Sequence, residues 1–426
     1  MKSNLVTAAS CLLAAIVAVG FAARPMLAAG QDQDNAPQKA EAAAPGQDQD
    51  SAPQKAEAPA PSKTQVESWT KPQPGWLYIL DPEPGAGRTG GRVWLIEPEN
   101  GKVMGSIATG TMADFALSPD GSRLYVASAV DGDASELAVI DTAQGVVLKS
   151  GIVNSRAMTD GLPPFSTMAV SGDGLAVRIL IDAPKPDKDA FLYATFDTRA
   201  GEFAPGVVPL GNCGPGRFIS HPAADHFDVL CPRSNKIRLI KVDADSRQLE
   251  HAEFVLPWER RVGAAAAIEV PGSQQINIVR GDGGVVAFDT STQRFDGTAA
   301  NPTLPNRVPP AAWPVSPDGS RLYLGYNTEY SRPDNRFYLD YGRAPNIRPS
   351  EATAGELHVL DTHTWKKIGT IKTKATVWSA VISRDGNTLY AMAPHKHSIL
   401  VIDTQKMHET RAIKIGGAPA LALVAP

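Results

Sequence analysis

Five aspartates recur at equivalent places along the chain and are the first residues to weigh for acid–base chemistry. Each follows an apolar run and precedes a threonine, and they are Asp141, Asp197, Asp289, Asp361 and Asp403. A catalytic acid is needed once per active site, whereas these acids return once per repeat. An aspartate after a strand commonly accepts hydrogen bonds from backbone N–H groups of its own turn. The pattern therefore predicts turn residues.

Histidines are the second class of residue that could do chemistry. His395 and His397 are spaced to place two imidazoles on one face of a strand. Their surroundings, Pro-His-Lys-His-Ser, are more typical of a connection between strands, so we expect solvated surface there. His358 and His363 flank an Asp-Thr pair without carboxylates suited to a metal. The chain also lacks Cys-x-x-Cys-His, Gly-x-Ser-x-Gly and His-Glu-x-x-His. We predict no catalytic, cofactor-binding or metal-binding residue in this chain.

Two of the three cysteines, Cys213 and Cys231, are placed to form a disulfide. They flank a predicted hairpin centred near Pro222, which would set them opposite each other on an antiparallel pair. The alternative is two unpaired thiols. The remaining cysteine, Cys11, lies in the N-terminal apolar segment.

A long segment, 327–355, is rich in the residue types that protein interfaces favour. We predict either a self-packed surface loop or a docking surface for another chain. The candidate interface residues are Tyr330, Arg332, Arg336, Phe337, Tyr338 and Tyr341.

The elements that must position these residues are short strands in a repeating unit. The string Ser-Pro-Asp-Gly-Ser-Arg-Leu-Tyr begins at residues 118 and 316, and looser copies begin at 171 and 383. An apolar run, an Asp-Gly turn and an alternating strand form a hairpin signature. The later Asp-Thr turn joins two more strands. Four strands per unit predict an all-β fold, a seven-bladed β-propeller with four-stranded antiparallel blades.

The blades can be placed along the chain. Six first strands are predicted near 113–118, 166–171, 217–221, 264–270, 311–316 and 377–383. The seventh blade is split, with strands at 76–81, 92–96 and 103–108 and a last strand at 420–425. Pairing of the N- and C-terminal strands in one blade would close the ring. A pair of β-sandwiches is the alternative fold.

Loop lengths distinguish the two faces of the predicted ring. Asp-Gly and Asp-Thr turns are short and share one face, whereas every long insertion falls on the other. Long loops on a rigid scaffold tend to carry function. The predicted working face therefore carries the insertions 82–91, 153–165, 182–189, 256–263, 298–310 and 327–355.

The N-terminal region divides into two parts ahead of the predicted propeller, 75–426. Residues 1–29 combine a basic start, an apolar run and small residues, which predicts a cleaved signal peptide, with an uncleaved anchor as the alternative. Residues 30–45 and 46–61 are a tandem duplication without large apolar residues. We predict a low-complexity arm over 30–74, either a spacer or a segment that docks on a partner subunit. Trp69 and Trp76 could pin it to the propeller.

Charge and composition narrow the function classes. The formal net charge is −4, which argues against a protein that binds nucleic acid by neutralising phosphates. A hydrophobic fraction of 43% is enough to bury a core. An export signal predicts an oxidising compartment, in which a disulfide persists.

The pattern resembles the heavy subunit of quinoprotein amine dehydrogenases, the methylamine and aromatic-amine dehydrogenase family. The resemblance covers 75–426 and rests on Leu77-Tyr-Ile-Leu-Asp-Pro, the strand from Val93, the Cys213…Cys231 hairpin and the closing Asp-Thr strands. It implies a periplasmic subunit of an α2β2 enzyme that oxidises a primary amine to aldehyde and ammonia. The tryptophan tryptophylquinone cofactor and catalytic base would lie on a light subunit, with a blue-copper protein of amicyanin or azurin type as electron acceptor. No cofactor is expected in this chain.

One departure from the family concerns the channel mouth, where methylamine enzymes carry a phenylalanine. Here the loop after Asp81-Pro has no aromatic residue. A stand-alone exported propeller that binds a ligand or surface partner is the alternative function. A propeller lactonase or hydrolase is a third, for which no acid–base set can be assembled.

Overall fold

The computed structural model divides the chain into two units, Met1–Pro59 and Ala60–Pro426, and the description below concerns the second. The structure describes residues 64–81, 90–130, 134–153, 168–182, 191–211, 217–220, 226–233, 236–243, 249–255, 264–269, 273, 275–280, 285–289, 291–292, 294–295, 313–326 and 355–426. The predicted signal peptide and the duplicated part of the arm lie outside these residues.

The described strands form seven separate antiparallel sheets, here called A to G in chain order. Sheet A holds β1 (Gln65–Ser68), β2 (Leu77–Asp81), β3 (Arg92–Glu97), β4 (Lys102–Ala108) and β29 (Leu421–Val424). Sheet B holds β5 (Thr111–Leu117), β6 (Arg123–Ala129), β7 (Ser135–Asp141) and β8 (Val146–Val153). Sheet C holds β9 (Met168–Val170), β10 (Ala176–Asp182), β11 (Phe191–Asp197), β12 (Glu202–Phe203) and β13 (Val208–Gly211).

The remaining four sheets complete the set. Sheet D holds β14 (Arg217–Ser220), β15 (His226–Arg233), β16 (Lys236–Asp243) and β17 (Leu249–Val255). Sheet E holds β18 (Ala264–Glu269), β19 (Gln275–Arg280), β20 (Val285–Asp289) and β21 (Arg294–Phe295). Sheet F holds β22 (Arg321–Tyr326), β23 (Gly355–Asp361) and β24 (Lys367–Thr373), and sheet G holds β25 (Ser379–Ile382), β26 (Thr388–Ala393), β27 (Ser398–Asp403) and β28 (His408–Lys414).

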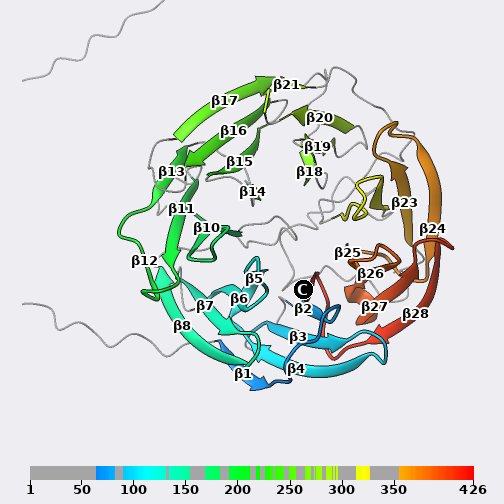
Figure 1. Ribbon diagram of the computed structural model, residues 1–426, viewed down its shortest axis with the longest axis horizontal. Coiled ribbons are helices and arrows are strands. Elements are labelled where there is room, and N and C mark those ends of the chain that lie inside the picture. The colour runs from blue at the N-terminus through cyan, green and yellow to red at the C-terminus, as the bar shows by residue number, and fades with distance from the viewer. Residues whose placement is uncertain are drawn as a thin grey trace, which may run out of the picture. The chain divides into compact units, whose positions relative to one another are not determined.

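The sheets follow one another around a ring in chain order, which is a β-propeller (Figure 1). The prediction of an all-β propeller is confirmed, but the prediction of four strands in every blade is wrong. Sheet A has a fifth strand, and in sheet C the outer position is broken into β12 and β13, which both pair with β11. Sheet F has three strands, and its first position is reduced to a single bridge between Val315 and Leu322.

Closure by the chain ends is confirmed. Strand β29 pairs antiparallel with β2, with Leu77 opposite Val424 and Leu80 opposite Leu421. The backbone N–H of Gly75 donates to the carbonyl oxygen of Ala425 at 3.0 Å and lengthens the ladder by one step. The N- and C-terminal strands are therefore hydrogen-bonded to each other inside one sheet, which closes the ring.

Strand β1 lies in the segment that the sequence assigned to the arm. It pairs antiparallel with β4, with Gln65 opposite Ala108 and Val66 opposite Ile107. This edge strand extends sheet A, so the propeller begins earlier than residue 75. The predicted boundary missed it because only one of its four residues, Val66, is apolar.

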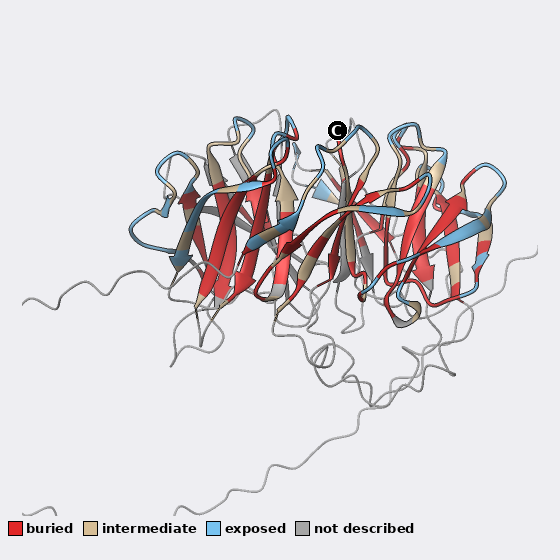
Figure 2. Ribbon diagram, turned by 90° about the horizontal axis from the view of Figure 1, so that it is seen from below, coloured by how far each residue is buried: buried red, intermediate tan, exposed pale blue. Residues whose placement is uncertain are grey.

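The core lies between neighbouring sheets. Tyr78 and Leu95 from sheet A pack with Phe115 and Leu124 from sheet B, and the junctions of B with C, F with G, and G with A are built in the same way. Burial of each such side chain stabilises the fold by about 1.5–3 kcal/mol. Buried strands and exposed turns alternate around the ring (Figure 2).

Gly110 marks a close approach between two sheets. A Cβ atom at this position would lie 2.0 Å from the carbonyl oxygen of Ala129, so no larger residue fits without a backbone shift. Its N–H donates to Oγ of Ser128 at 3.1 Å. Gly110 is therefore a structural residue between β4 and β5.

Candidate functional site

The recurring aspartates are turn residues, as predicted. In sheet B, Oδ1 of Asp141 accepts hydrogen bonds from the backbone N–H groups of Ala143 and Gln144, both at 2.9 Å. The equivalent carboxylates make the same pair of bonds, and they are Asp197, Asp289, Asp361 and Asp403. Backbone hydrogen bonds lower the pKa of Asp197, Asp361 and Asp403, because they stabilise the ionised form. These acids are anchors for the Asp-Thr turns.

The Asp-Gly turns are organised by a second set of carboxylates. Oδ1 of Asp120 accepts hydrogen bonds from the hydroxyl of Ser118 at 2.6 Å and from the backbone N–H of Ser122 at 3.0 Å. These bonds lower the pKa of Asp120 to about 2. The pKa is lowered for the same reason at the equivalent residues, Asp173, Asp318 and Asp385.

A threonine links the two turns in sheets B, C, F and G. The hydroxyl of Thr142 donates to the carbonyl oxygen of Gly121 at 2.7 Å, so the second turn is held against the first. The same bond recurs from Thr198 to Gly174, from Thr362 to Gly319 and from Thr404 to Gly386. The Ser-x-Asp-Gly and Asp-Thr signals in the sequence therefore describe one structural device.

Tyrosines connect successive sheets at the same level. The Tyr125 hydroxyl of sheet B donates to the carbonyl oxygen of Gly174 in sheet C at 3.0 Å. Burial raises the pKa of Tyr125 to about 12. Its phenol is therefore a neutral donor at physiological pH and serves the junction between sheets.

The predicted disulfide falls partly outside the described residues, since Cys213 is not among them. Cys231 lies in β15, opposite Arg238 of β16. On its other side, β15 pairs with β14 so that Arg217 faces Leu230. This register centres the hairpin about one and a half residues after Pro222, the centre that the sequence predicts. The disulfide itself stays a prediction.

The predicted docking residues also lie outside the described residues. They are Tyr330, Arg332, Arg336, Phe337, Tyr338 and Tyr341. The same holds for most of the long insertions that define the predicted working face. The described part of the chain therefore supplies other candidates for a functional site.

His397 and His358 occupy structural positions. Residues Pro394–Lys396 form a 3-10 turn between β26 and β27, which confirms the predicted connection. His397 follows with a positive φ of 49°, and its Nδ1 lies 3.0 Å from the carbonyl oxygen of Gly417. His358 is buried in β23 with Nε2 at 3.2 Å from Oε2 of Glu356, and burial lowers its pKa. Among the described residues, no three His, Cys, Asp or Glu side chains are grouped to hold a metal ion.

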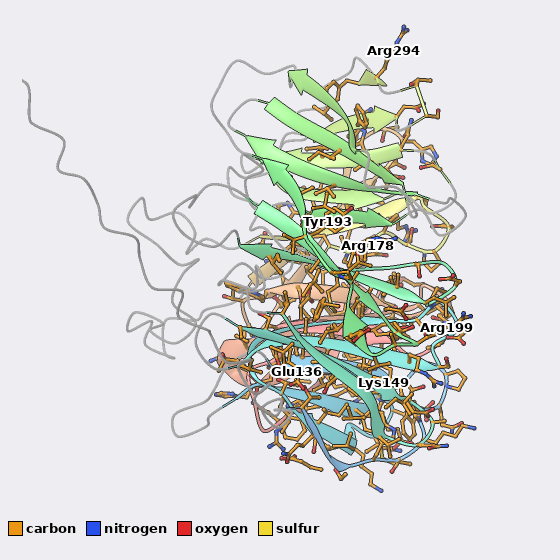
Figure 3. The ribbon with its side chains drawn as sticks, turned by 90° about the vertical axis from the view of Figure 1, so that its left-hand side faces the viewer. Glu136, Lys149, Arg178, Tyr193, Arg199 and Arg294 are labelled. Atoms are coloured by element: carbon orange, nitrogen blue, oxygen red, sulfur yellow. The ribbon has the colours of Figure 1, made fainter. Side chains whose placement is uncertain are left out.

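Two of the buried charged side chains are Glu136 in sheet B and Arg178 in sheet C (Figure 3). The carboxylate of Glu136 accepts hydrogen bonds from the backbone N–H of Thr64 at 3.2 Å and from its hydroxyl at 3.1 Å. Arg178 of β10 faces Thr195 of β11 in the register, and Tyr193 is two positions from Thr195 in the same strand. Arg178 and Tyr193 therefore lie on the same side of sheet C. Burial raises the pKa of Tyr193, and the positive charge of Arg178 opposes that rise.

The segment 64–69, here called the strap, is fastened along the outer edge of sheet A. Thr64 binds Glu136 of sheet B, and Glu67 forms an ion pair with Arg92 and accepts a hydrogen bond from the Ser106 hydroxyl at 2.9 Å. At the other end, Nε1 of Trp69 donates to the carbonyl oxygen of Thr142 at 2.8 Å. The Trp69 ring stacks on Tyr78 with 6.1 Å between centroids. The prediction that Trp69 pins the arm to the propeller is confirmed.

A solvent-open hollow of about 380 Å³ lies on sheet G beside its two turns. Its lining is mostly polar, with Val401 and Ile402 as the two apolar residues, and comprises Asn387, Thr388, Val401, Ile402, Asp403, Gln405 and Thr410. The amide of Gln405 donates to Oδ1 of Asn387 at 2.9 Å, and the Thr410 hydroxyl donates to the carbonyl oxygen of Val401 at 2.9 Å. Sequence reasoning missed this site. The only signal was Thr388, which stands where two other repeats carry arginine.

No helix among the described residues is both long and apolar enough to span a membrane.

Neither a protein-family model nor a curated protein sequence matches this chain. Several solved structures are similar in fold. A candidate 6-phosphogluconolactonase from Bacteroides uniformis is 13% identical, with a TM-score of 0.59, over 82% of this chain and 99% of its own. Hydrazine synthase from Kuenenia stuttgartiensis is 15% identical, with a TM-score of 0.52, over 74% and 89%. AztD from Citrobacter koseri is 13% identical, with a TM-score of 0.50, over 82% and 98%. At these identities the similarity establishes one property of this chain, its β-propeller fold.

Proposed function

We propose that this chain is the heavy, non-catalytic subunit of a periplasmic amine dehydrogenase. In this assignment it scaffolds a light subunit that carries tryptophan tryptophylquinone, in an α2β2 assembly. The light subunit oxidises a primary amine to aldehyde and ammonia and passes electrons to a blue-copper protein. The family resemblance of 75–426 and the N-terminal export signal are the sequence features that support the proposal.

The observation that carries the proposal is that the acidic side chains of the repeats accept hydrogen bonds within their own turns. Each recurring aspartate accepts backbone hydrogen bonds in its own turn, and Asp120 and Asp318 have pKa values of about 2. A general acid near neutral pH needs a pKa close to that pH. Carboxylates held ionised in turns suit a scaffold, and they are unsuited to proton donation.

We further assign each of the seven sheets to one blade of a seven-bladed ring, with the N- and C-terminal strands sharing the first blade. The short turns then form one rigid face. The opposite face carries the insertions, including the segment 327–355, which we assign to partner binding.

The experiment is purification of the tagged full-length chain from the periplasm of its native host. The proposal expects a smaller, quinone-staining protein to copurify in equal amount. A matched purification should use a host in which any small, cysteine-rich exported reading frame beside the gene is deleted. A chain that elutes alone from the intact host would overturn the proposal and favour the stand-alone exported propeller.

A further inference from the structure

Sheets B and G place an aspartate opposite different residues in the same register. In sheet B, Arg123 faces Asp141, and Nη1 of Arg123 donates to Oδ2 of Asp141 at 2.8 Å. In sheet G, Thr388 faces Asp403. The short threonine side chain leaves space where sheet B has a guanidinium group, and the hollow of about 380 Å³ lies there.

The two oxygens of the Asp403 carboxylate have different partners: one accepts backbone hydrogen bonds, and the other contacts a lysine side chain. Oδ1 accepts hydrogen bonds from the N–H groups of Gln405 and Lys406 at 3.0 and 2.8 Å, as Oδ1 of Asp141 does in sheet B. Oδ2 has Nζ of Lys406 at 3.2 Å as its neighbour. The Lys406 side chain is 73% exposed, whereas that of Asp403 is 24% exposed. An exposed lysine is a weak and displaceable partner.

We propose that the sheet G hollow binds a guanidinium group from outside the chain, which takes the place that Arg123 fills in sheet B. The proposal is independent of the amine dehydrogenase assignment. Guanidinium fits this site because its planar N–H groups can bond several acceptors at once. Asp403, Thr388 and Asn387 line the hollow and carry acceptor oxygens, and Val401 offers an apolar wall for a methylene stem. The volume falls in the range of small ligand sites, about 300–1,000 Å³.

The test measures binding to the full chain by methyl NMR, with the Val401 methyl signals as the readout. The probes are methylguanidinium, an acetyl-Gly-Arg-Gly-amide peptide and the same peptide with citrulline, which has the arginine shape without the charge. We expect the first two to bind with dissociation constants on the order of 1 mM, because one charge-assisted contact at an open site gives modest affinity. Binding of the peptide would point to an arginine of a protein partner, and binding of methylguanidinium alone to a small-molecule source. Both results support the site.

Three variants separate the proposed site from general charge attraction. Asp403→Asn should weaken binding at least about tenfold, because the ionic acceptor is lost. Thr388→Arg should abolish it, because the new side chain reproduces the arrangement of sheet B. Asp141→Asn is the matched control in sheet B and should leave the Val401 titration unchanged. Lys406→Gln should strengthen binding by about two- to threefold, as expected for removal of a weak surface competitor.

Two results would overturn the proposal. One is equal binding of the citrulline and arginine peptides, since the site would then not distinguish a charged guanidinium group from a neutral group of the same shape. The other is an Asp403→Asn variant that remains folded and binds methylguanidinium as tightly as the parent protein. Because Asp403→Asn keeps the size of the side chain, this arm remains decisive even if Thr388→Arg does not fold.

Discussion

Sheets B and G carry the same pair of turns and differ in what surrounds them. In both, an aspartate anchors each turn and a threonine ties the two turns together. In sheet B the space beside the turns is filled by Arg123, and the outer turn is covered by Trp69 of the strap. In sheet G the corresponding space is open. The repeat keeps its backbone anchors and varies the side chains between them, so one scaffold offers a closed surface in one sheet and a binding hollow in another.

Among the predicted variants, we expect the largest loss of stability from replacement of Trp69, which covers a turn of sheet B. Replacing Trp69 with alanine should destabilise the propeller by roughly 2 kcal/mol, less than the ~3–5 kcal/mol of a fully buried aromatic residue. Urea unfolding of the mature chain would measure this. Trp69→Phe is the control, since it keeps stacking on Tyr78 and loses only the hydrogen bond to Thr142. If Trp69→Ala has the stability of the parent, the strap does not fasten the arm.

The hydrogen bond from the linking threonine should contribute equally to the free energy of unfolding in sheets B and G. Thr142→Val and Thr404→Val each remove one hydroxyl that donates to a glycine carbonyl, and each should cost about 0.5–1.5 kcal/mol. Thermal unfolding of the two variants and of the double variant would test this. The effects should add, because the two links share no partner. A cost in one sheet only would refute a device common to the sheets that carry this link.

The sequence predicted these shared parts well because they rest on local chemistry. The string Ser118-Pro-Asp-Gly fixes a turn through its own side chains, so its repetition reveals the strands on either side. The Asp-Thr turns were predicted for the same reason, and the closure by β29 followed from the order of the repeats along the chain. Strand β1 and the sheet G hollow were missed because both depend on contacts between distant residues. Thr64 finds Glu136 seventy-two positions away, and the hollow exists because Thr388 is short relative to an arginine in another repeat.

Sheet B can be given the threonine that sheet G carries at the equivalent position after the Asp-Gly turn. Arg123→Thr should open a hollow in sheet B and cost only about 0–1 kcal/mol, because the ion pair with Asp141 is partly exposed. The variant should also gain a second methylguanidinium site, observable as a shift of the Val139 methyl signals. If no second site appears although the variant is folded, the turn carboxylate alone does not make the site.

Acid should produce the smallest loss of stability for each residue involved. This loss should be shared by the sheets that carry an Asp-Gly turn. The pKa of Asp120 and of Asp318 is lowered to about 2 from an ordinary value of 3.8 by hydrogen bonds in the Asp-Gly turns. Such groups stabilise the fold above the unfolded-state pKa, and this contribution is lost as pH falls toward the folded-state pKa. The melting temperature should therefore decrease between about pH 4 and about pH 2. The decrease should be shallower in Asp120→Asn, and an unchanged slope would contradict this role of the carboxylate.

The mass of the intact assembly in native mass spectrometry tests the proposed function most directly. The sample is protein purified without denaturant from the native periplasm. We expect a species with two copies of this chain and two copies of a smaller chain that retains a quinone after denaturation. A species with the mass of this chain alone, at most the 45.1 kDa of the full sequence, would contradict the assignment as a scaffold subunit.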